Sequence, residues 1–368
     1  MGKLTVQLPD VQYDVYVGEH VYELFSSQYK ELLQSADRVG IIADEQVAAM
    51  HLPILEKALA DAGVSPSVKI VPSGEKCKTP AVYIDCQSYL LTENFTRNSL
   101  LIAFGGGACG DLTGFVAATF MRGIRFIQCP TTILSHDSAV GGKTAINLPE
   151  GKNMVGSFHQ PSAVLFNTAL LGTLPHREIR SGMAELIKHA FISDENWALE
   201  LLEDRTFTEP TNEWLSVELV KGIKVKADIV AEDEFEHSTR KYLNFGHTFG
   251  HAVEAVCGFG GLSHGECIMI GMGYSFILSE RHGEITESFT KRFIDFSIMN
   301  GYTFEPVLNH SFQEFLDYMK KDKKASFGDL NFVMLEKIGK PFVKKVSIEE
   351  CEIVFRELQN RLDEGGNV

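Results

Sequence analysis

An apolar segment that runs directly into a cluster of glycines constrains the fold of this chain more than any other part of the sequence. Ser99-Leu-Leu-Ile-Ala-Phe104 has the length and composition of a buried β-strand. Gly105-Gly-Gly-Ala-Cys-Gly-Asp111 follows at once, and an apolar helical pattern starts within it. A strand, a glycine turn and a helix in this order are typical of a parallel sheet covered by helices.

The rest of the first half alternates in the same way. Strand-like segments occur at Arg38–Asp44, Ser67–Val71, Phe126–Cys129 and Ala163–Phe166, and helical spacing at Glu45–Ala60 and Tyr83–Glu93. From about residue 180 helical patterns dominate, with one alternating segment at Leu330–Leu335. The sequence therefore predicts an α/β fold whose first half contains a parallel sheet and whose second half is mostly α-helical.

Size and charge limit the classes of function. A chain of 368 residues is long enough for about two domains. It has 34 Lys and Arg residues against 49 Asp and Glu residues, a net charge of −15, which argues against nucleic acid or an anionic membrane as a partner. The seven cysteines are odd in number and show no CxxC spacing, and the segment MGKLTVQLPD lacks the apolar core of a signal peptide. These features predict a cytoplasmic protein with free thiols and no membrane span.

The glycine turn is a candidate nucleotide site. Gly105, Gly107 and Gly110 satisfy the pattern GxGxxG in the required context between a strand and a helix. Such a turn lets a pyrophosphate approach the backbone at a helix N-terminus. The acidic residue expected about twenty positions later is missing, and Asp44, at the end of an earlier strand, could replace it. The alternative is a tight turn that binds no ligand.

A second glycine-rich segment lies nearby. Asp137-Ser-Ala-Val-Gly-Gly-Lys143 combines a carboxylate and an amine, and Lys152 and Asn153 follow. An amine beside backbone N–H groups suits a phosphate. The alternative is an ordinary solvated loop.

A group of histidines and carboxylates indicates a metal site. Glu185, Lys188 and His189 share one face of a predicted helix, His247 and His251 are four positions apart, and His264 opens a later helix. Two histidines and a glutamate with open coordination positions are typical of catalytic Zn²⁺. Spacing alone leaves the choice of ligands open, and any one of these histidines could be an ordinary core or surface residue.

Taken together, the motifs resemble the 3-dehydroquinate synthase family of sugar phosphate cyclases. The matching strings are GEKCKT, GGGACGDLTGFVAATFMRG, PTTILSHDSAVGGKTAINLPEGKN, SGMAELIKHA, YLNFGHTFGHAVEA, HGE and DKK, spread from about Asp44 to Lys340. The resemblance implies a Rossmann-like NAD-binding domain at 1–180 and a mostly helical metal- and substrate-binding domain at 181–368. It also implies an active site in the cleft between them, in a homodimer.

The resemblance assigns site residues by position. It implies Zn²⁺, with Co²⁺ as an alternative, on Glu185, His247 and His264. It implies NAD contacts from Asp44, Ser73, Gly74, Glu75, Lys78, Gly106, Gly107, Ala108, Cys109, Gly110, Asp111, Thr131, Thr132, Lys143, Lys152, Thr173, Leu174 and Glu178.

The remaining assigned residues would act on a small sugar phosphate. The resemblance places Lys143, Asn153, His251 and one of Lys323 and Lys324 at the phosphate, with Lys323 preferred. It places Lys226, Arg240 and Asn244 at a carboxylate, and Asp137 and Lys188 at the reacting hydroxyls. Arg122 matches an arginine that the family lends across a dimer interface.

The implied activity is conversion of 3-deoxy-D-arabino-heptulosonate 7-phosphate into 3-dehydroquinate and phosphate, the second step of the shikimate pathway. Another cyclase would act on a sugar phosphate without a carboxylate, which would leave Arg240 and Lys226 without an anion to bind. A metal-dependent polyol dehydrogenase would not need the Lys143–Asn153 segment and would accumulate NADH. A non-catalytic nucleotide-sensing module would contain no metal.

Overall fold

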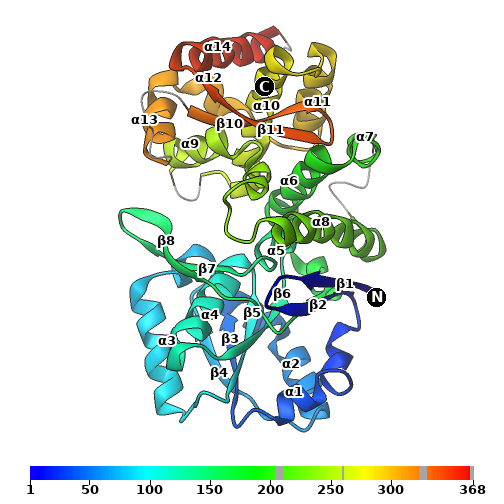
Figure 1. The fold of residues 1–368 in the computed structure, drawn as a ribbon, viewed down its shortest axis with the longest axis vertical. Coiled ribbons are helices and arrows are strands. Elements are labelled where there is room, and N and C mark those ends of the chain that lie inside the picture. The colour runs from blue at the N-terminus through cyan, green and yellow to red at the C-terminus, as the bar shows by residue number, and fades with distance from the viewer. Residues whose placement is uncertain (204–209, 259–260, 323–329, 365–368) are drawn as a thin grey trace. The chain divides into compact units, whose positions relative to one another are not determined.

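The computed structural model describes residues 1–203, 210–258, 261–322 and 330–364, which form two compact units. The first unit comprises Met1–Leu174 and Thr211–Glu234, and the second Pro175–Pro210 and Phe235–Val368. The first unit is built on a seven-stranded sheet (Figure 1). In spatial order its strands are β1 (Gly2–Gln7), β2 (Gln12–Gly18), β9 (Ala163–Asn167), β6 (Arg125–Pro130), β5 (Leu100–Gly105), β3 (Val39–Asp44) and β4 (Ser67–Val71).

The winding direction of the sheet reverses at β3 and β5. β1 is antiparallel to β2, and the other neighbouring strands are parallel. From β3 the chain moves outward to β4, returns to β5 on the other side of β3, and continues outward to β6 and β9. In open parallel sheets, ligands bind at the carboxyl ends of the strands where the winding direction reverses. Here that point lies beside Asp44 and Gly105, the last residues of β3 and β5.

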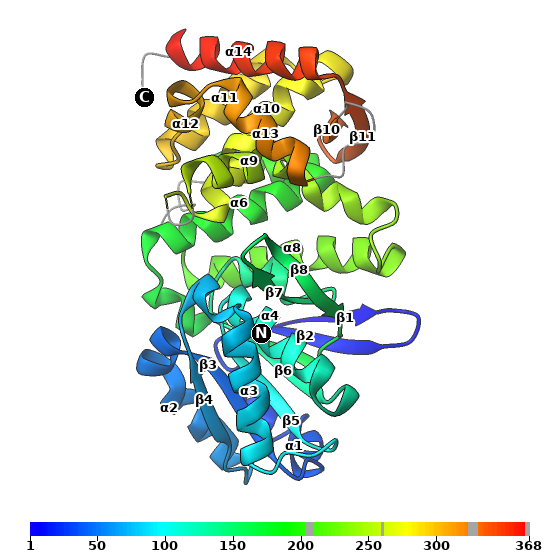
Figure 2. The same cartoon turned by 90° about the vertical axis from the view of Figure 1, so that its left-hand side faces the viewer.

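Helices cover both faces of the sheet because successive strand residues point to opposite sides. Ile41 packs into a core with η1 (Val21–Phe25), α1 (Lys30–Gln34) and α2 (Glu45–Asp61). Its neighbour Ile42 packs into the opposite core. Figure 2 shows α3 in front of the strands on this second side of the sheet. The elements of that second face are η2 (Gly74–Cys77), α3 (Pro80–Thr92), α4 (Gly107–Thr119) and η3 (Phe120–Arg122).

The first unit is completed by a hairpin and further helices. The hairpin of β7 and β8 packs against α4, where Gly114 allows close contact: a Cβ there would lie 2.4 Å from Cγ2 of Thr144. α8 packs against β1 and α5. These elements are α5 (Ser135–Ser138), β7 (Lys143–Leu148), β8 (Gly151–Phe158), η4 (Thr168–Thr173) and α8 (Asn212–Glu232).

The second unit is mostly helical and centres on α10, which is buried along most of its length. Two glycines let the backbone of α10 touch its neighbours: a Cβ on Gly265 would lie 2.1 Å from the Ser181 carbonyl oxygen, and one on Gly271 would lie 1.9 Å from that of Gly246. The elements are α6 (His176–Ser193), α7 (Glu195–Glu203), η5 (Thr239–Asn244), α9 (His247–Cys257), α10 (His264–His282), α11 (Glu287–Met299), α12 (Glu305–Asn309), α13 (Phe312–Asp322), β10 (Leu330–Lys337), β11 (Lys340–Val346) and α14 (Ile348–Glu364).

The structure confirms the predicted α/β class, with a parallel sheet in the first half and helices in the second. Its division of the chain differs from the predicted domains 1–180 and 181–368. Residue 180 lies inside α6, so a boundary there would cut a continuous helix, and the contacts instead divide the chain after Leu174. Residues 211–234 pack with the first unit rather than the second. Among the described residues, no helix has the length and hydropathy to cross a membrane.

Candidate functional site

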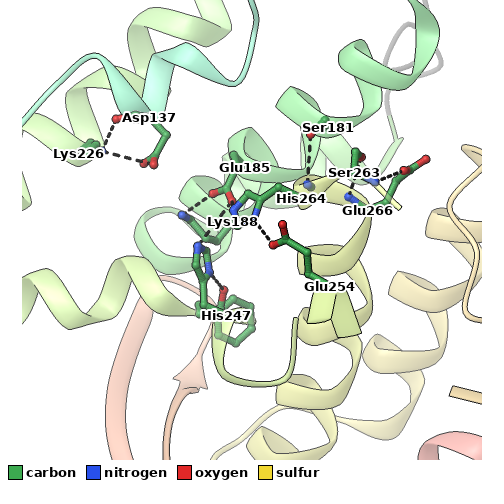
Figure 3. A network of polar contacts seen from close by, with 12 residues as sticks. Asp137, Ser181, Glu185, Lys188, Lys226, His247, Glu254, Ser263, His264 and Glu266 are labelled. Atoms are coloured by element: carbon green, nitrogen blue, oxygen red, sulfur yellow. Dashed lines mark hydrogen bonds and ion pairs between the residues drawn. The ribbon is translucent and has the colours of Figure 1, made fainter. Parts of the chain in front are cut away.

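Three side chains from three elements of the second unit converge on one point (Figure 3). Oε1 of Glu185, on α6, lies 3.2 Å from Nε2 of His264 and 3.6 Å from Nε2 of His247. His247 and His264 are the first residues of α9 and α10, and Glu185 is buried. The structure therefore brings together the three predicted metal ligands, and their oxygen and nitrogen donors match the set that Zn²⁺ prefers.

His251 lies in the same cluster, one helical turn after His247. His247, His251 and His264 each contribute one ring nitrogen, and these three nitrogens lie within 4.8 Å of one another. Either Glu185 or His251 could therefore be the third ligand beside His247 and His264. The assignment of Glu185 as a ligand and of His251 to the phosphate stays a prediction.

The charges around the cluster set the protonation of its histidines. Burial, and then the Lys188 ammonium, hold the pKa of His247 well below its ordinary value of 6.5, so its ring is neutral and can donate a lone pair. Lys188 itself lies 2.5 Å from Oε2 of Glu185. Burial also opposes a charge on His264, but hydrogen bonds to the carboxylates of Glu185 and Glu254 prevail and raise the pKa of His264 to about 10. A metal ion bound to His264 would therefore have to displace a proton from its ring.

The residues around Ser263 fix where α10 begins, and therefore where His264 lies. Ser263 caps α10: its Oγ accepts from the Glu266 N–H at 3.4 Å, and its own N–H donates to Oε2 of Glu266 at 2.7 Å. This capping box holds His264 in the first turn. Arg180 donates to the same Glu266 carboxylate at 3.2 Å, which ties the start of α10 to α6.

The first unit contains a separate group of predicted residues at the end of β3. One carboxylate oxygen of Asp44 accepts from the N–H groups of Gln46 and Val47 and from Ser73 Oγ, at 3.0, 3.3 and 2.5 Å. The other accepts from the Gly74 N–H at 3.1 Å. The structure thus gathers Asp44, Ser73 and Gly74, three predicted NAD contacts, at the carboxyl end of the strand.

The start of α4 offers a bare backbone surface beside Asp44. A Cβ on Gly105 would lie 3.0 Å from Cβ of Asp44, one on Gly106 would lie 3.0 Å from Cγ2 of Thr132, and one on Gly107 would lie 2.6 Å from Oγ of Ser138. At Gly105 a Cβ would also lie 2.7 Å from Cβ of Cys109, which cannot move without the backbone, so glycine is required there. The first N–H groups of a helix lack intrahelical partners, so this cradle suits a pyrophosphate and fits NAD.

A buried lysine connects three further predicted residues. Nζ of Lys78 donates to Oδ2 of Asp111 at 2.7 Å and also to Oδ1 of Asn153. Burial opposes the charge on Lys78, but the carboxylates of Asp111 and Glu75 raise its pKa above the ordinary value. Glu75 accepts a hydrogen bond from Nδ2 of Asn147 at 2.6 Å. Asn147 is not among the residues predicted from the sequence.

The residues predicted for the substrate are divided between the units. In the first unit, Nζ of Lys226 donates to the carbonyl oxygen of Asp137 and lies 3.4 Å from its carboxylate (Figure 3). In the second unit, Arg240 is almost completely buried on η5, and Asn244, at the end of η5, donates to Oε1 of Glu236 at 2.9 Å.

Other predicted residues are dispersed. Arg122 is exposed, with a φ of 69°, directly after Met121 with a φ of 49°. Oγ1 of Thr173 lies 2.8 Å from Nε2 of His51, and Glu178 lies on α6, where burial raises its pKa. The positions of the others are as follows: Ala108, Cys109 and Gly110 on α4, Thr131 and Thr132 after β6, Lys143 on β7, Lys152 on β8 and Leu174 after η4. Lys323 and Lys324 lie outside the described residues.

Sequence reasoning missed Glu254, whose Oε2 lies 3.3 Å from Nδ1 of His264. A signal was present, because Glu254 follows His247 by seven positions and His251 by three, so all three lie on one face of α9.

Comparison with known proteins shows the family of the chain. The models "3-dehydroquinate synthase N-terminal" and "3-dehydroquinate synthase C-terminal" match residues 68–181 and 182–325. The chain is 50% identical over 362 residues to a 3-dehydroquinate synthase of Lysinibacillus sphaericus (strain C3-41), which covers 98% of this chain and 99% of that relative.

Solved structures show the same architecture. A 2-deoxy-scyllo-inosose synthase complexed with carbaglucose-6-phosphate, NAD⁺ and Co²⁺ has a TM-score of 0.86 at 25% identity, covering 97% of this chain and 100% of that one. A 2-epi-5-epi-valiolone synthase from Streptomyces hygroscopicus subsp. jinggangensis 5008, with NAD⁺ and Zn²⁺ bound, has a TM-score of 0.84 at 24% identity, with coverages of 96% and 99%. With both family models and a full-length relative in agreement, the chain belongs to the 3-dehydroquinate synthase family.

Proposed function

We propose that this chain converts 3-deoxy-D-arabino-heptulosonate 7-phosphate into 3-dehydroquinate and inorganic phosphate. The reaction would proceed by transient oxidation, phosphate elimination, re-reduction and aldol ring closure, which makes the enzyme a carbon–oxygen lyase. The observation that carries the proposal is the convergence of Glu185, His247 and His264, because a chain of this family with a built metal site retains the means for catalysis.

NAD⁺ and a divalent metal ion, Zn²⁺ or Co²⁺, are the proposed cofactors. The glycine cradle beside Asp44 supports NAD⁺, and the histidine cluster supports the metal ion. Similar solved structures hold NAD⁺ with Co²⁺ or with Zn²⁺. When bound, NAD⁺ would accept and return a hydride, and the metal ion would polarise the oxygen of the reacting hydroxyl.

The chain's own residues would bind and orient the substrate. In the first unit, Lys143 and Asn153 are proposed to hold the phosphate, and the Lys226–Asp137 pair would orient the substrate's polar groups. In the second unit, the buried guanidinium of Arg240 is proposed to bind the carboxylate together with Asn244, since its planar fork matches two carboxylate oxygens.

The remaining assignments in the second unit concern proton movement and charge. Lys188 Nζ, held against Glu185, is proposed to donate a hydrogen bond to a reacting hydroxyl oxygen. His251 is proposed to act on the phosphate side of the substrate, where its ring can donate or accept a proton.

The subunit arrangement and the cellular location of the protein are also proposed. A homodimer is proposed because Arg122 matches the arginine that the family lends across a dimer interface, and its exposed position leaves it accessible to a partner subunit. None of the seven cysteines, all of which lie in the described residues, forms a disulfide, which supports a cytoplasmic location, since thiols persist in reducing compartments.

Phosphate release from the heptulosonate phosphate, measured with and without NAD⁺ and after metal removal, tests the proposal. We expect release only when both cofactors are present, with no net rise in NADH absorbance. Stoichiometric NADH would indicate a polyol dehydrogenase. Release only from a sugar phosphate without a carboxylate would indicate another cyclase, and a protein that binds neither cofactor would indicate a non-catalytic module.

A further inference from the structure

The hairpin of β7 and β8 has a register irregularity at Asn147. Ile146 pairs with Val155 and Leu148 pairs with Gly151, so the register shifts across the residue between them. The N–H of Asn147 donates to the carbonyl oxygen of Lys78 at 2.7 Å, outside the hairpin. One residue of β7 thus lies opposite three residues of β8, so the extra residues, Asn153 among them, are in β8. Such bulges are common beside active sites.

The side-chain amide of Asn147 connects two segments that lie far apart in the sequence. Its Nδ2 donates to Oε2 of Glu75 at 2.6 Å, and its Oδ1 accepts from the N–H of Asn153 at 2.9 Å. The side chain therefore donates a hydrogen bond to a residue of η2 and accepts one from a residue of β8. Of the uncharged side chains of this size, only an amide offers both functions in one planar group.

Asn153 needs such support because its backbone is in the left-handed region, with a φ of 59°. Its Oδ1 also accepts from Nζ of Lys78, which is bound to Asp111. The hydrogen bonds thus form a closed ring: Asn147 to Lys78 through the backbone, Lys78 to Asn153 through side chains, and Asn153 back to Asn147.

We propose that Asn147 is a positioning residue that holds Glu75 in place for NAD⁺ and Asn153 in place for the substrate phosphate. The inference rests on the proposed function, which gives Glu75 and Asn153 those roles. Asn147 acts through them and itself needs to touch neither ligand.

The test compares Asn147→Ala with Glu150→Ala, an exposed control in the same hairpin. Because a hydrogen bond to a charged group is lost, we expect the NAD⁺ Kd, measured by titration calorimetry, to rise about tenfold in Asn147→Ala. The KM for the heptulosonate phosphate should rise, while kcat at saturation changes less. Glu150→Ala should match the wild type in all three quantities. Asn147→Asp keeps the acceptor for Asn153 and loses the donor to Glu75, so it should weaken NAD⁺ binding with little effect on the substrate KM.

A double-mutant cycle with Glu75→Ala separates positioning from general destabilisation. If Asn147 acts through Glu75, adding Asn147→Ala to Glu75→Ala should weaken NAD⁺ binding no further. Additive losses, or a lower Tm with unchanged NAD⁺ and substrate constants, would overturn the inference. The inference would also be overturned if the wild type is active and the Asn147 variants match Glu150→Ala in NAD⁺ Kd, substrate KM and kcat. A wild type that releases no phosphate would instead overturn the proposed function.

Discussion

Oε2 of Glu254 lies 3.3 Å from Nδ1 of His264, while Nε2 of the same ring lies 3.2 Å from Oε1 of Glu185. One nitrogen of His264 is thus held by a carboxylate from α9, and the other faces the remaining metal-ligand candidates. Metal-binding histidines commonly have this arrangement, because a carboxylate on the second nitrogen fixes the tautomer and the ring orientation.

Glu254→Gln should therefore weaken metal binding by about 10- to 100-fold, since the amide orients the ring without the negative charge. Competition with a chromophoric chelator would measure the Kd for Zn²⁺ directly. Glu287→Gln, an exposed change on α11 in the same unit, serves as the control. An affinity equal to that of the control would show that Glu254 has no part in holding the metal.

Gly271 of α10 should tolerate no side chain. The methyl group that Gly271→Ala adds would collide with the carbonyl oxygen of Gly246, the residue directly before His247. The variant could fold only if α10 moved away from the start of α9. We expect a loss of about 1–3 kcal/mol in the free energy of unfolding, or more. Gly273→Ala is the matched control, since the nearest atom to its Cβ is on the side chain of Phe304 at 3.0 Å, a longer contact that involves no backbone. Equal denaturant midpoints for the two variants would contradict the packing described for α10.

The sequence predicts strands and helices with continuous apolar runs well, but it does not predict which other elements they pack against. The strand before Gly105 and the helix after it follow from hydrophobicity and glycine alone. The helical spacing of α8 is also clear, but an amphipathic face does not specify which unit it packs against. The hairpin of β7 and β8 was not predicted as strands, since most of β8 is exposed and lacks the alternation of a half-buried strand.

The metal cluster shows the same limit. Helical spacing relates His247 to His251, but only tertiary packing brings Glu185 and His264 to them. The resemblance to a family supplied that relation, and the structure is consistent with it. Glu254 and Asn147 were missed because a glutamate on an amphipathic helix and an asparagine in a hairpin are ordinary surface residues by pattern. Their roles come from contacts that spacing cannot encode.

Thiol chemistry provides a test of the packing in both units. Six of the seven cysteines are buried, and Cys257 is the one that is partly exposed. Burial raises the pKa of Cys86 and of Cys109 to about 12, so at pH 8 about one molecule in ten thousand carries either thiolate. We expect one fast-reacting thiol per chain with a disulfide reagent at pH 8 and seven after denaturation. Two or more fast thiols in the native protein would contradict the described burial.

Arg240 provides the sharpest distinction between this activity and that of a cyclase acting on a substrate without a carboxylate. The residue is 1% exposed and lies on η5, seven positions before His247. Charged hydrogen bonds contribute about 1.5–3 kcal/mol. Arg240→Ala should therefore lower kcat/KM by roughly 10- to 150-fold for the heptulosonate phosphate, and only slightly for an analogue that lacks the carboxylate.

Arg240→Lys refines this test, because it keeps the charge and loses the planar fork. We expect a loss between that of Arg240→Ala and that of the wild type, again specific to the carboxylated substrate. Since Arg240 is buried, both variants also require a Tm measurement, and the comparison of two substrates on one variant cancels any loss of folded protein. If Arg240 serves only to stabilise η5, each variant will penalise both substrates equally, and the carboxylate assignment would then be wrong.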